Sequence, residues 1–268
     1  MIGKLKKLPE SAQQVLRLAA CMGSRFDLNT LSLIHEKSVI ETFHDLMPVL
    51  KEELILPLSD PEMTGSDICS SSLAIEQLQF LHDRVQQAAY ALIDESHKQS
   101  VHLQIGRLLM RKTSADAYEE KIFDIARHFN QSIELLTDPT EQLEIAQLNL
   151  TAGQKAKMSA AHKAAVSYLT AGRECLGENC WETDYDLTLT LHTEAAEAAY
   201  LSGDFEQMEE LAQVVLQHVR TLSDEAKVCA IRIPAYTTQN QQKKAMAVGL
   251  TFLKRLGMSP RVNLIQRF

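Results

Sequence analysis

The fold is decided by the stretch AAEAAYLSGDF at residues 195–205, which resembles AGQKAKMSA at residues 152–160. The two stretches begin 43 residues apart, and in both of them small side chains recur four positions apart before a polar break. Small residues at this spacing lie on one helix face and allow a second helix to approach closely. Gly203 suits a tight turn, and Asp204 suits a helix N-cap. The pattern therefore predicts antiparallel helix pairs that stack like tetratricopeptide repeats.

This repeat makes predictions for particular positions. Ala156 and Ala199 occupy matching slots where paired helices should approach, and Glu209 is expected on the solvent face of the second helix of its pair. A weaker third copy is expected at residues 235–250. The alternative to stacked repeats is an irregular helical bundle.

From Asp83 onward the apolar periodicity is helical throughout. The expected helices are Asp83–Ile93, Ser96–Met110, Tyr118–Ser132, Thr140–Met158, Ala160–Cys175, Asp184–Leu201, Asp204–Thr221, Asp224–Thr238 and Gln241–Leu256. Short breaks join them, so neighbouring helices should pack antiparallel.

The N-terminal part mixes helix and strand signals. Helices are expected after Pro9, after Asp27 and after Ser38, with Pro48 kinking or dividing the third. Short strands are expected at residues 54–58 and 78–81, joined by a long polar loop. Three helices followed by a hairpin is the order of a winged helix. The predicted fold is mostly α: a winged-helix domain at residues 1–95 with a wing loop at 59–77, then a TPR-like helical region at 96–268, expected to be truncated at its C-terminus.

Composition excludes several classes of protein. Hydrophobic residues make up 45% and charged residues 23%, the balance of a folded globular chain. No apolar run reaches the roughly 18 residues that a membrane helix needs, and the N-terminus is not a signal peptide. The five cysteines are sparse and odd in number, which favours reduced thiols and a cytoplasmic location. A net charge of −8 gives no general attraction to nucleic acid or to a membrane.

A search for catalytic and ligand-binding motifs gives no positive result. The sequence has no Walker-type or Rossmann glycine loop, no H-E-x-x-H, no G-x-S-x-G and no kinase H-R-D or D-F-G motif. Cys175 and Cys180 lack a second pair for zinc. His44 is followed by an acidic residue and a proline, as in a histidine-kinase phosphoacceptor helix, but the proline comes one residue too soon, so a structural histidine is favoured. We expect no enzyme activity and no catalytic, cofactor or metal residue.

One local feature is a candidate contact site. The predicted strand that ends at Leu81 leads through His82 into a helix that Asp83 can cap. His82, Asp83 and Arg84 would then lie at an exposed strand-to-helix corner. The functional interpretation is an interdomain contact that senses a neighbouring ATPase module, and the alternative is a capped, purely structural corner.

A free-standing DNA-binding regulator with a ligand-sensing or partner-sensing helical domain is the rival function. Its recognition helix would be residues 38–53, which carry one basic and four acidic side chains. A helix that reads a DNA groove needs basic side chains to neutralise phosphates. This charge balance argues against nucleic acid as a partner.

Taken in order, several segments resemble a known family. They are LPESAQQVLRLAACMG (8–23), FDL (26–28), FLHDRVQQAAY (80–90), HLQIGRLL (102–109), IFDIARHFN (122–130) and LNLTAGQKA (148–156). The series resembles the middle region of large bacterial, especially cyanobacterial, multi-sensor serine/threonine and histidine signalling kinases. In those proteins a winged helix and a helical-repeat region lie between a STAND-type AAA ATPase and a GAF sensor with a histidine kinase.

The resemblance implies a non-catalytic regulatory segment and a fragment of a larger protein. Its partners would be proteins, an ATPase or kinase module in cis or in trans. No catalytic residue of the family falls within this chain, and the ATPase-sensing role of His82 and Asp83 is what the resemblance implies.

Overall fold

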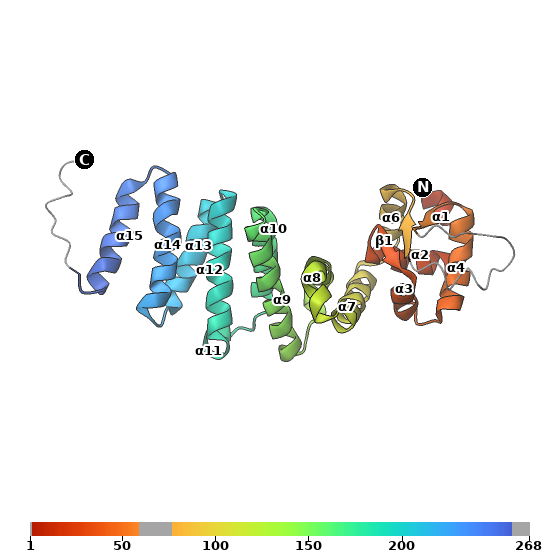
Figure 1. Cartoon of the computed structure of the whole chain (residues 1–268), viewed down its shortest axis with the longest axis horizontal. Helices are drawn as coiled ribbons and strands as arrows, with labels where there is room; N and C mark the ends of the chain where they lie inside the picture. Colours follow the sequence, from red (N-terminus) through yellow and green to blue (C-terminus); the bar gives the residue numbers. More distant parts are fainter. Residues whose placement is uncertain (1, 59–76, 259–268) are drawn as a thin grey trace. The chain divides into compact units, whose positions relative to one another are not determined.

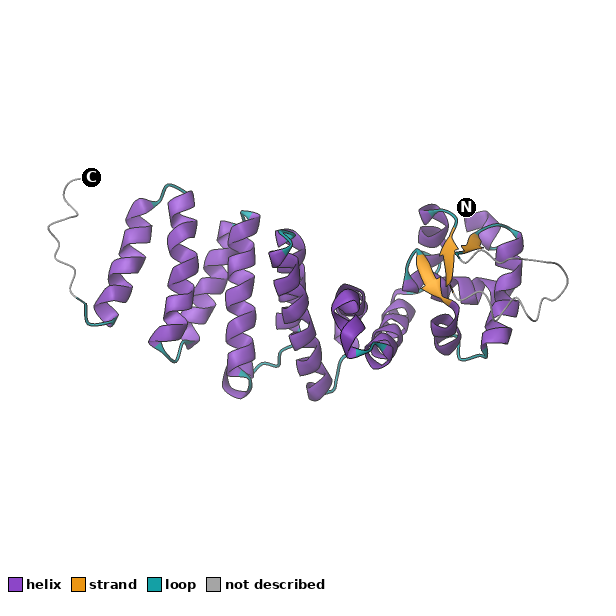
Figure 2. Ribbon diagram, viewed as in Figure 1, coloured by secondary structure: helices purple, strands orange, loops and turns teal. Residues whose placement is uncertain are grey.

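The structure is a computed structural model that describes residues 2–58 and 77–258. The fold is mostly α, with a small antiparallel sheet, as predicted (Figure 2). The chain forms two compact units, residues 1–135 and residues 136–268, and each is described here by itself.

Unit 1 contains the sheet and a first set of helices (Figure 1). In chain order its elements are α1 (Ile2–Leu5), α2 (Glu10–Met22), β1 (Arg25–Asp27), α3 (Leu28–Ile34), α4 (Val39–Lys51), β2 (Ile55–Pro57), β3 (Gln77–Phe80), α6 (Asp83–Tyr90), α7 (Glu95–Lys112), α8 (Ala115–Asn130) and the short 3-10 helix η1 (Ile133–Leu135).

The sheet has one strand more than the predicted hairpin. Strand β1 pairs with β3, which also pairs with β2, so the strand order is β1-β3-β2 and all pairs are antiparallel. Phe26 of β1 is buried, and its ring lies 5.6 Å from that of Phe80. Three residues carry too short an alternation to be recognised as a strand in the sequence. Most of the predicted wing loop, residues 59–76, lies outside the described residues; its last residue, Gln77, begins β3.

Helix α4 begins with the N-cap predicted at Ser38. The Ser38 hydroxyl accepts a hydrogen bond from the backbone N–H of Glu41, whose side chain accepts one from the Ser38 backbone N–H in return. The expectation that Pro48 divides this helix was wrong, because α4 continues to Lys51. Pro48 lies in the last turn, where the missing N–H removes one hydrogen bond near an end that frays in any case.

Helices α7 and α8 lie in unit 1, while the predicted domain boundary near residue 95 stays a prediction. Helix α7 packs against α2 and α3. Val101 and Ile105 of α7 belong to the same hydrophobic core as α2 and the sheet. Gly106 brings α7 close to α8: a Cβ added there would lie 3.1 Å from the Phe129 ring. Apolar burial therefore groups α7 with the sheet, and α8 packs against α7.

Unit 2 is made of antiparallel helices joined by short connections (Figure 1). They are α9 (Pro139–Met158), α10 (His162–Glu174), the short α11 (Cys180–Thr183), α12 (Tyr185–Ser202), α13 (Phe205–His218), α14 (Leu222–Thr238) and α15 (Gln242–Arg255). Helix α9 pairs with α10, α12 with α13, and α14 with α15, while α10 and α12 pack against each other across the first two pairs.

The same turn closes all three helix pairs. Ala160, Gly203 and Asn240 adopt positive φ angles of 57°, 86° and 57°. Each turn makes a hydrogen bond from the next residue's N–H back to a carbonyl five residues earlier, the bond that defines a Schellman motif. These bonds are Ala161 N to Ala156 O (2.9 Å), Asp204 N to Ala199 O (2.9 Å) and Gln241 N to Tyr236 O (2.8 Å). Ala156 and Ala199, which the sequence repeat placed at matching positions, therefore each supply the carbonyl that accepts the turn hydrogen bond. In the third helix pair the equivalent carbonyl belongs to Tyr236.

Small residues occupy the sites where paired helices approach. Ala156 and Ala199 are buried. A Cβ added to Gly153 of α9 would lie 2.5 Å from Cγ of Leu169 in α10, well inside van der Waals contact. The two helices can pack at this separation only because Gly153 has no side chain.

Glu209 does not lie on a solvent face, so that expectation was wrong. Its carboxylate accepts two hydrogen bonds from Arg232, at 3.1 and 2.6 Å, and one from the Tyr236 hydroxyl at 2.8 Å. Gln213 donates a further bond to it at 2.8 Å. Glu209 therefore connects α13 to α14, and the exposed residue of this helix turn is Glu210.

Candidate functional site

The predicted contact residues lie where the sequence placed them, between β3 and α6. His82, Asp83 and Arg84 are all exposed, and with Leu81 they line a shallow hollow of about 570 Å³. Within residues 2–58 and 77–258, no hydrogen bond or ion pair engages these three side chains. They are free to meet a partner, and their role stays a prediction.

Asp83 does not cap the helix as predicted. The cap position is His82, in extended geometry, and no side-chain hydrogen bond caps the helix there. Asp83 is instead the first helical residue, where its negative charge is stabilised by the helix dipole. Helix α6 is held farther along by Gln86, which donates a hydrogen bond to the backbone carbonyl of Ala20 at 3.1 Å.

A chain of polar side chains, with two buried histidines at its centre, connects α6, α7 and α8. Nδ1 of His102 lies 2.8 Å from Nδ1 of His128, and Nε2 of His102 lies 3.1 Å from the Tyr90 hydroxyl. The Tyr90 hydroxyl lies 3.1 Å from the Gln131 side-chain oxygen, and Nη2 of Arg127 lies 3.2 Å from Nε2 of His128. Both imidazoles are about 1% exposed.

This geometry fits only one arrangement of protons. A guanidinium can only donate, so Nε2 of His128 accepts from Arg127 and Nδ1 of His128 carries a proton. That proton is donated to Nδ1 of His102, whose Nε2–H is donated to the Tyr90 hydroxyl. Tyr90 in turn donates to Gln131. All the hydrogen bonds then point in one direction, and each can strengthen the next.

Both histidines are neutral at physiological pH. Burial, together with the nearby charges of Arg127 and Lys98, lowers the pKa of His102 to about 4. Burial lowers the pKa of His128 to about 2, with Arg127 and His102 acting in the same direction. The pair therefore serves as a fixed polar link between α7 and α8.

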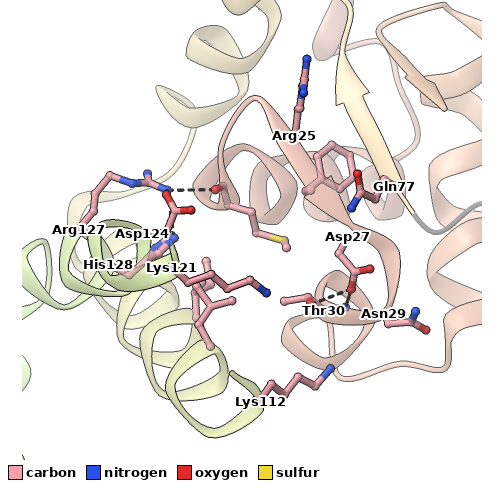
Figure 3. A pocket seen from close by; sticks show the side chains of 14 residues that line it. Arg25, Asp27, Asn29, Thr30, Gln77, Lys112, Lys121, Asp124, Arg127 and His128 are labelled. Atoms are coloured by element: carbon pink, nitrogen blue, oxygen red, sulfur yellow. Dashed lines mark hydrogen bonds and ion pairs between the residues drawn. The ribbon is translucent and has the colours of Figure 1, made fainter. Parts of the chain in front are cut away.

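A groove opens beside this link, on the side of Arg127 (Figure 3). One wall is formed by β1 and the start of α3, and the other by α7 and α8. The hollow has a volume of about 580 Å³. Its apolar lining comes from Met22, Phe26, Ile105 and Leu109.

The charged lining of the groove is predominantly basic. It comprises Arg25, Lys112, Lys121 and Arg127 against the acidic residues Asp27 and Asp124. The Asp27 carboxylate caps α3, accepting hydrogen bonds from the backbone N–H of Thr30 at 2.6 Å and from its hydroxyl at 2.8 Å. Asp124 lies 3.8 Å from Arg127. Positive charge is therefore in excess along this groove, although the chain as a whole carries −8.

Arg127 is the best anchored of these basic side chains. Besides His128, it donates a hydrogen bond to the backbone carbonyl of Met22 at 3.2 Å. It therefore connects the buried histidine pair to the end of α2 and to the groove surface. Its pattern in the sequence gave no sign of this role, because an isolated arginine on an amphipathic helix is usually a solvated side chain.

Tyr90, His102 and His128 lie within the segments that resemble the signalling kinases, but their local pattern indicates no role. The burial of His102 and His128 could have been inferred from the sequence, because both fall within apolar-periodic runs, next to Val101 and Phe129. In the structure these four residues are buried. Among the described residues, no cluster of histidine, cysteine and carboxylate side chains could hold a metal ion. No helix in that part of the chain is long and apolar enough to span a bilayer.

The described cysteines are free thiols. Burial raises the pKa of Cys21 and of Cys175 to about 12, so both thiols stay protonated and unreactive. His44, considered as a phosphoacceptor, is exposed on α4, and its neighbours Phe43 and Leu46 are buried.

Comparison with known proteins finds a similar region in a signalling kinase. The chain is 28% identical, over 312 aligned residues, to Hybrid signal transduction histidine kinase G of Dictyostelium discoideum. The alignment covers 98% of this chain and 9% of that protein, so the chain spans about a tenth of its relative's length. No protein-family model matches the chain, and no solved structure matches it significantly. The chain is thus related to a region of a signal-transduction kinase.

Proposed function

We propose that this chain is a non-catalytic regulatory and protein-interaction segment of a signal-transduction kinase. The observation that supports this most directly is the alignment of almost the whole chain with a small part of a hybrid histidine kinase. The sequence carries no phosphate-binding glycine loop and no kinase catalytic motif, so this segment would act on its kinase by contact.

The finer proposal concerns the parent protein. The order of elements from α2 to β3 (helix, strand, helix, helix, strand, strand) with the strand order β1-β3-β2 supports a winged helix. The helix pairs of unit 2, closed by three equivalent turns, support a TPR-like array. This combination fits the region between a STAND-type ATPase and a GAF–histidine kinase in bacterial multi-sensor kinases. We propose a cytoplasmic protein whose partner is such an ATPase or kinase module, with His82, Asp83 and Arg84 as one contact.

The charges on and beside helix α4 argue against the rival function, a DNA-binding regulator. Helix α4 would be the recognition helix, and among its exposed side chains is the acidic capping residue Glu41. Asp45 is paired with Lys37 at 2.7 Å, which removes a basic side chain from use on DNA. Glu52 and Glu53 follow at the exposed end of the helix.

The proposal can be tested with the purified chain. Incubation with labelled ATP and magnesium should give no hydrolysis and no phosphorylated protein. The flanking genomic DNA should encode an ATPase or a kinase module, and isothermal titration with each such module should show binding of this chain to at least one of them. Turnover above a buffer control, or failure to bind either module, would overturn the proposed function.

A further inference from the structure

We propose that the groove between β1–α3 and α7–α8 binds an acidic peptide segment of the partner protein, one in which carboxylates flank apolar side chains. This inference rests on the proposed function, since it names the surface and the partner chemistry of the interaction segment. Its main hollow is lined by none of His82, Asp83 and Arg84, and Asp83 lines only the second hollow that adjoins it.

The first argument is the shape of the groove. The hollow of about 580 Å³ adjoins a second one of about 540 Å³, which is lined by residues of β1, α6 and α8 among others. Both hollows are lined by Met22, Arg25, Asp124 and Arg127. An elongated depression of this kind suits an extended chain better than a single compact anion.

The second argument is charge. Lys112 and Lys121 are exposed, and in the described parts of the chain neither has an ion-pair partner. Figure 3 shows both side chains extending from α7 and α8 toward the wall formed by β1 and α3. Arg25 is the exposed basic residue of that opposite wall. An occupant of the groove would therefore have basic side chains on both sides of it, which favours one that carries several negative charges.

The third argument is the floor. Phe26 and Ile105 are buried beneath the groove, and Met22 and Leu109 are half-buried there. An apolar floor under a basic rim offers burial to an apolar side chain and pairing to its acidic neighbours. A nucleic-acid backbone would use the rim and leave the floor unfilled. Inorganic phosphate would fill neither the length nor the floor.

Arg127 gives the site a fixed point. Its guanidinium is held by the Met22 carbonyl and by His128, which is itself fixed by His102. A donor that is already positioned loses little conformational freedom when a carboxylate binds. The buried histidine chain therefore preorganises the groove.

The experiment uses fluorescence anisotropy with the full chain. The probe is a fluorescein-labelled peptide in which glutamates flank a central Leu-Phe pair. The same peptide with glutamine in place of glutamate, a labelled DNA duplex and inorganic phosphate as a competitor are measured beside it. We expect the acidic peptide to bind, and binding to weaken as salt is raised.

The decisive variant is Lys112→Gln with Lys121→Gln, which removes two rim charges without adding new ones. It should weaken binding of the acidic peptide about tenfold. The matched control is Lys163→Gln with Lys243→Gln, two exposed lysines of unit 2, which should leave binding unchanged. Circular dichroism checks that both variants remain folded.

Three results would overturn the inference: no binding of the acidic peptide, equal binding by the rim and control variants, or tighter binding of the glutamine peptide or DNA. The same rim variant is then titrated with the ATPase or kinase modules expected to be encoded in the flanking DNA. If the wild-type chain binds a module and the rim variant binds it equally well, the groove proposal fails and the proposed function stands. If the wild-type chain binds neither module, the proposed function itself fails.

Discussion

Two glycines of unit 2 should respond in opposite ways to the same substitution. Gly153 lies inside α9, and an added Cβ would lie 2.5 Å from Cγ and 2.7 Å from Cδ2 of Leu169. Gly249 lies inside α15, and its added Cβ would have Ile233 Cδ1 as its nearest neighbour, at 3.8 Å. Gly153→Ala should destabilise unit 2, and Gly249→Ala should stabilise it.

The magnitudes follow from two opposing effects. Alanine is favoured over glycine in a helix interior by about 1 kcal/mol at either position. At Gly153 the new methyl group meets the middle of a fully buried side chain, where overpacking typically costs about 1–3 kcal/mol. The net expectation is a loss of up to about 2 kcal/mol for Gly153→Ala and a gain of about 0.5–1 kcal/mol for Gly249→Ala.

A double-mutant cycle tests the cause of the loss. Leu169→Ala alone should cost about 2–5 kcal/mol, because it leaves a cavity between α9 and α10. In the double variant the methyl group of Ala at position 153 fills part of that cavity. The double variant should therefore lose less stability than the two single changes added together, by about 1 kcal/mol or more.

Urea denaturation followed by tryptophan fluorescence measures these changes. Trp181 is the single tryptophan of the chain, and its ring stacks on that of His218 at 4.5 Å, so its emission reports on unit 2. If Gly153→Ala stabilised the protein as much as Gly249→Ala does, the close approach of α9 and α10 would be refuted. Strict additivity in the cycle would show that Leu169 is not the group that resists the methyl.

Two further predictions address the repeat and the buried histidines. Ala199→Leu and Ala156→Leu should each lower the free energy of unfolding by about 1–3 kcal/mol through overpacking, and so lower the melting temperature. Glu210→Leu on the exposed face should change the melting temperature little. If Ala156→Leu were harmless while Ala199→Leu was harmful, the repeat would be contradicted. The pKa values of His102 and His128 in the folded chain lie below that of a histidine in the unfolded chain. The stability that the two neutral rings contribute to unit 1 should therefore be fully present above about pH 6.5 and should fall as the pH drops toward 4, by on the order of 3 kcal/mol for His102 alone. NMR titration of the imidazole signals checks this, and a pKa near 6.5 for either ring would contradict the buried chain.

Local sequence patterns predicted the helices well because their signals are local. The cap at Ser38, the turn at Gly203 and the apolar periodicity each act within a few residues, so they can be read without knowledge of the rest of the chain. The repeat was also visible, because the same close approach imposes the same small residues at Ala156 and Ala199. Strand β1 was missed because it is defined by pairing with β3, a distant segment.

The sequence by itself thus determined a mostly helical chain with paired helices, an acidic third helix and no catalytic motif. Only the tertiary structure decided what lies side by side. It grouped α7 and α8 with the sheet, joined His102 to His128, and turned Glu209 from a predicted surface residue into the centre of an ion-pair network with Arg232. It also gathered the basic side chains of three separate segments around one groove. The physical reason is that hydrogen bonds and charge pairs between distant segments depend on how helices pack, and helix packing is set by the fit of whole surfaces, which no local run of residues specifies.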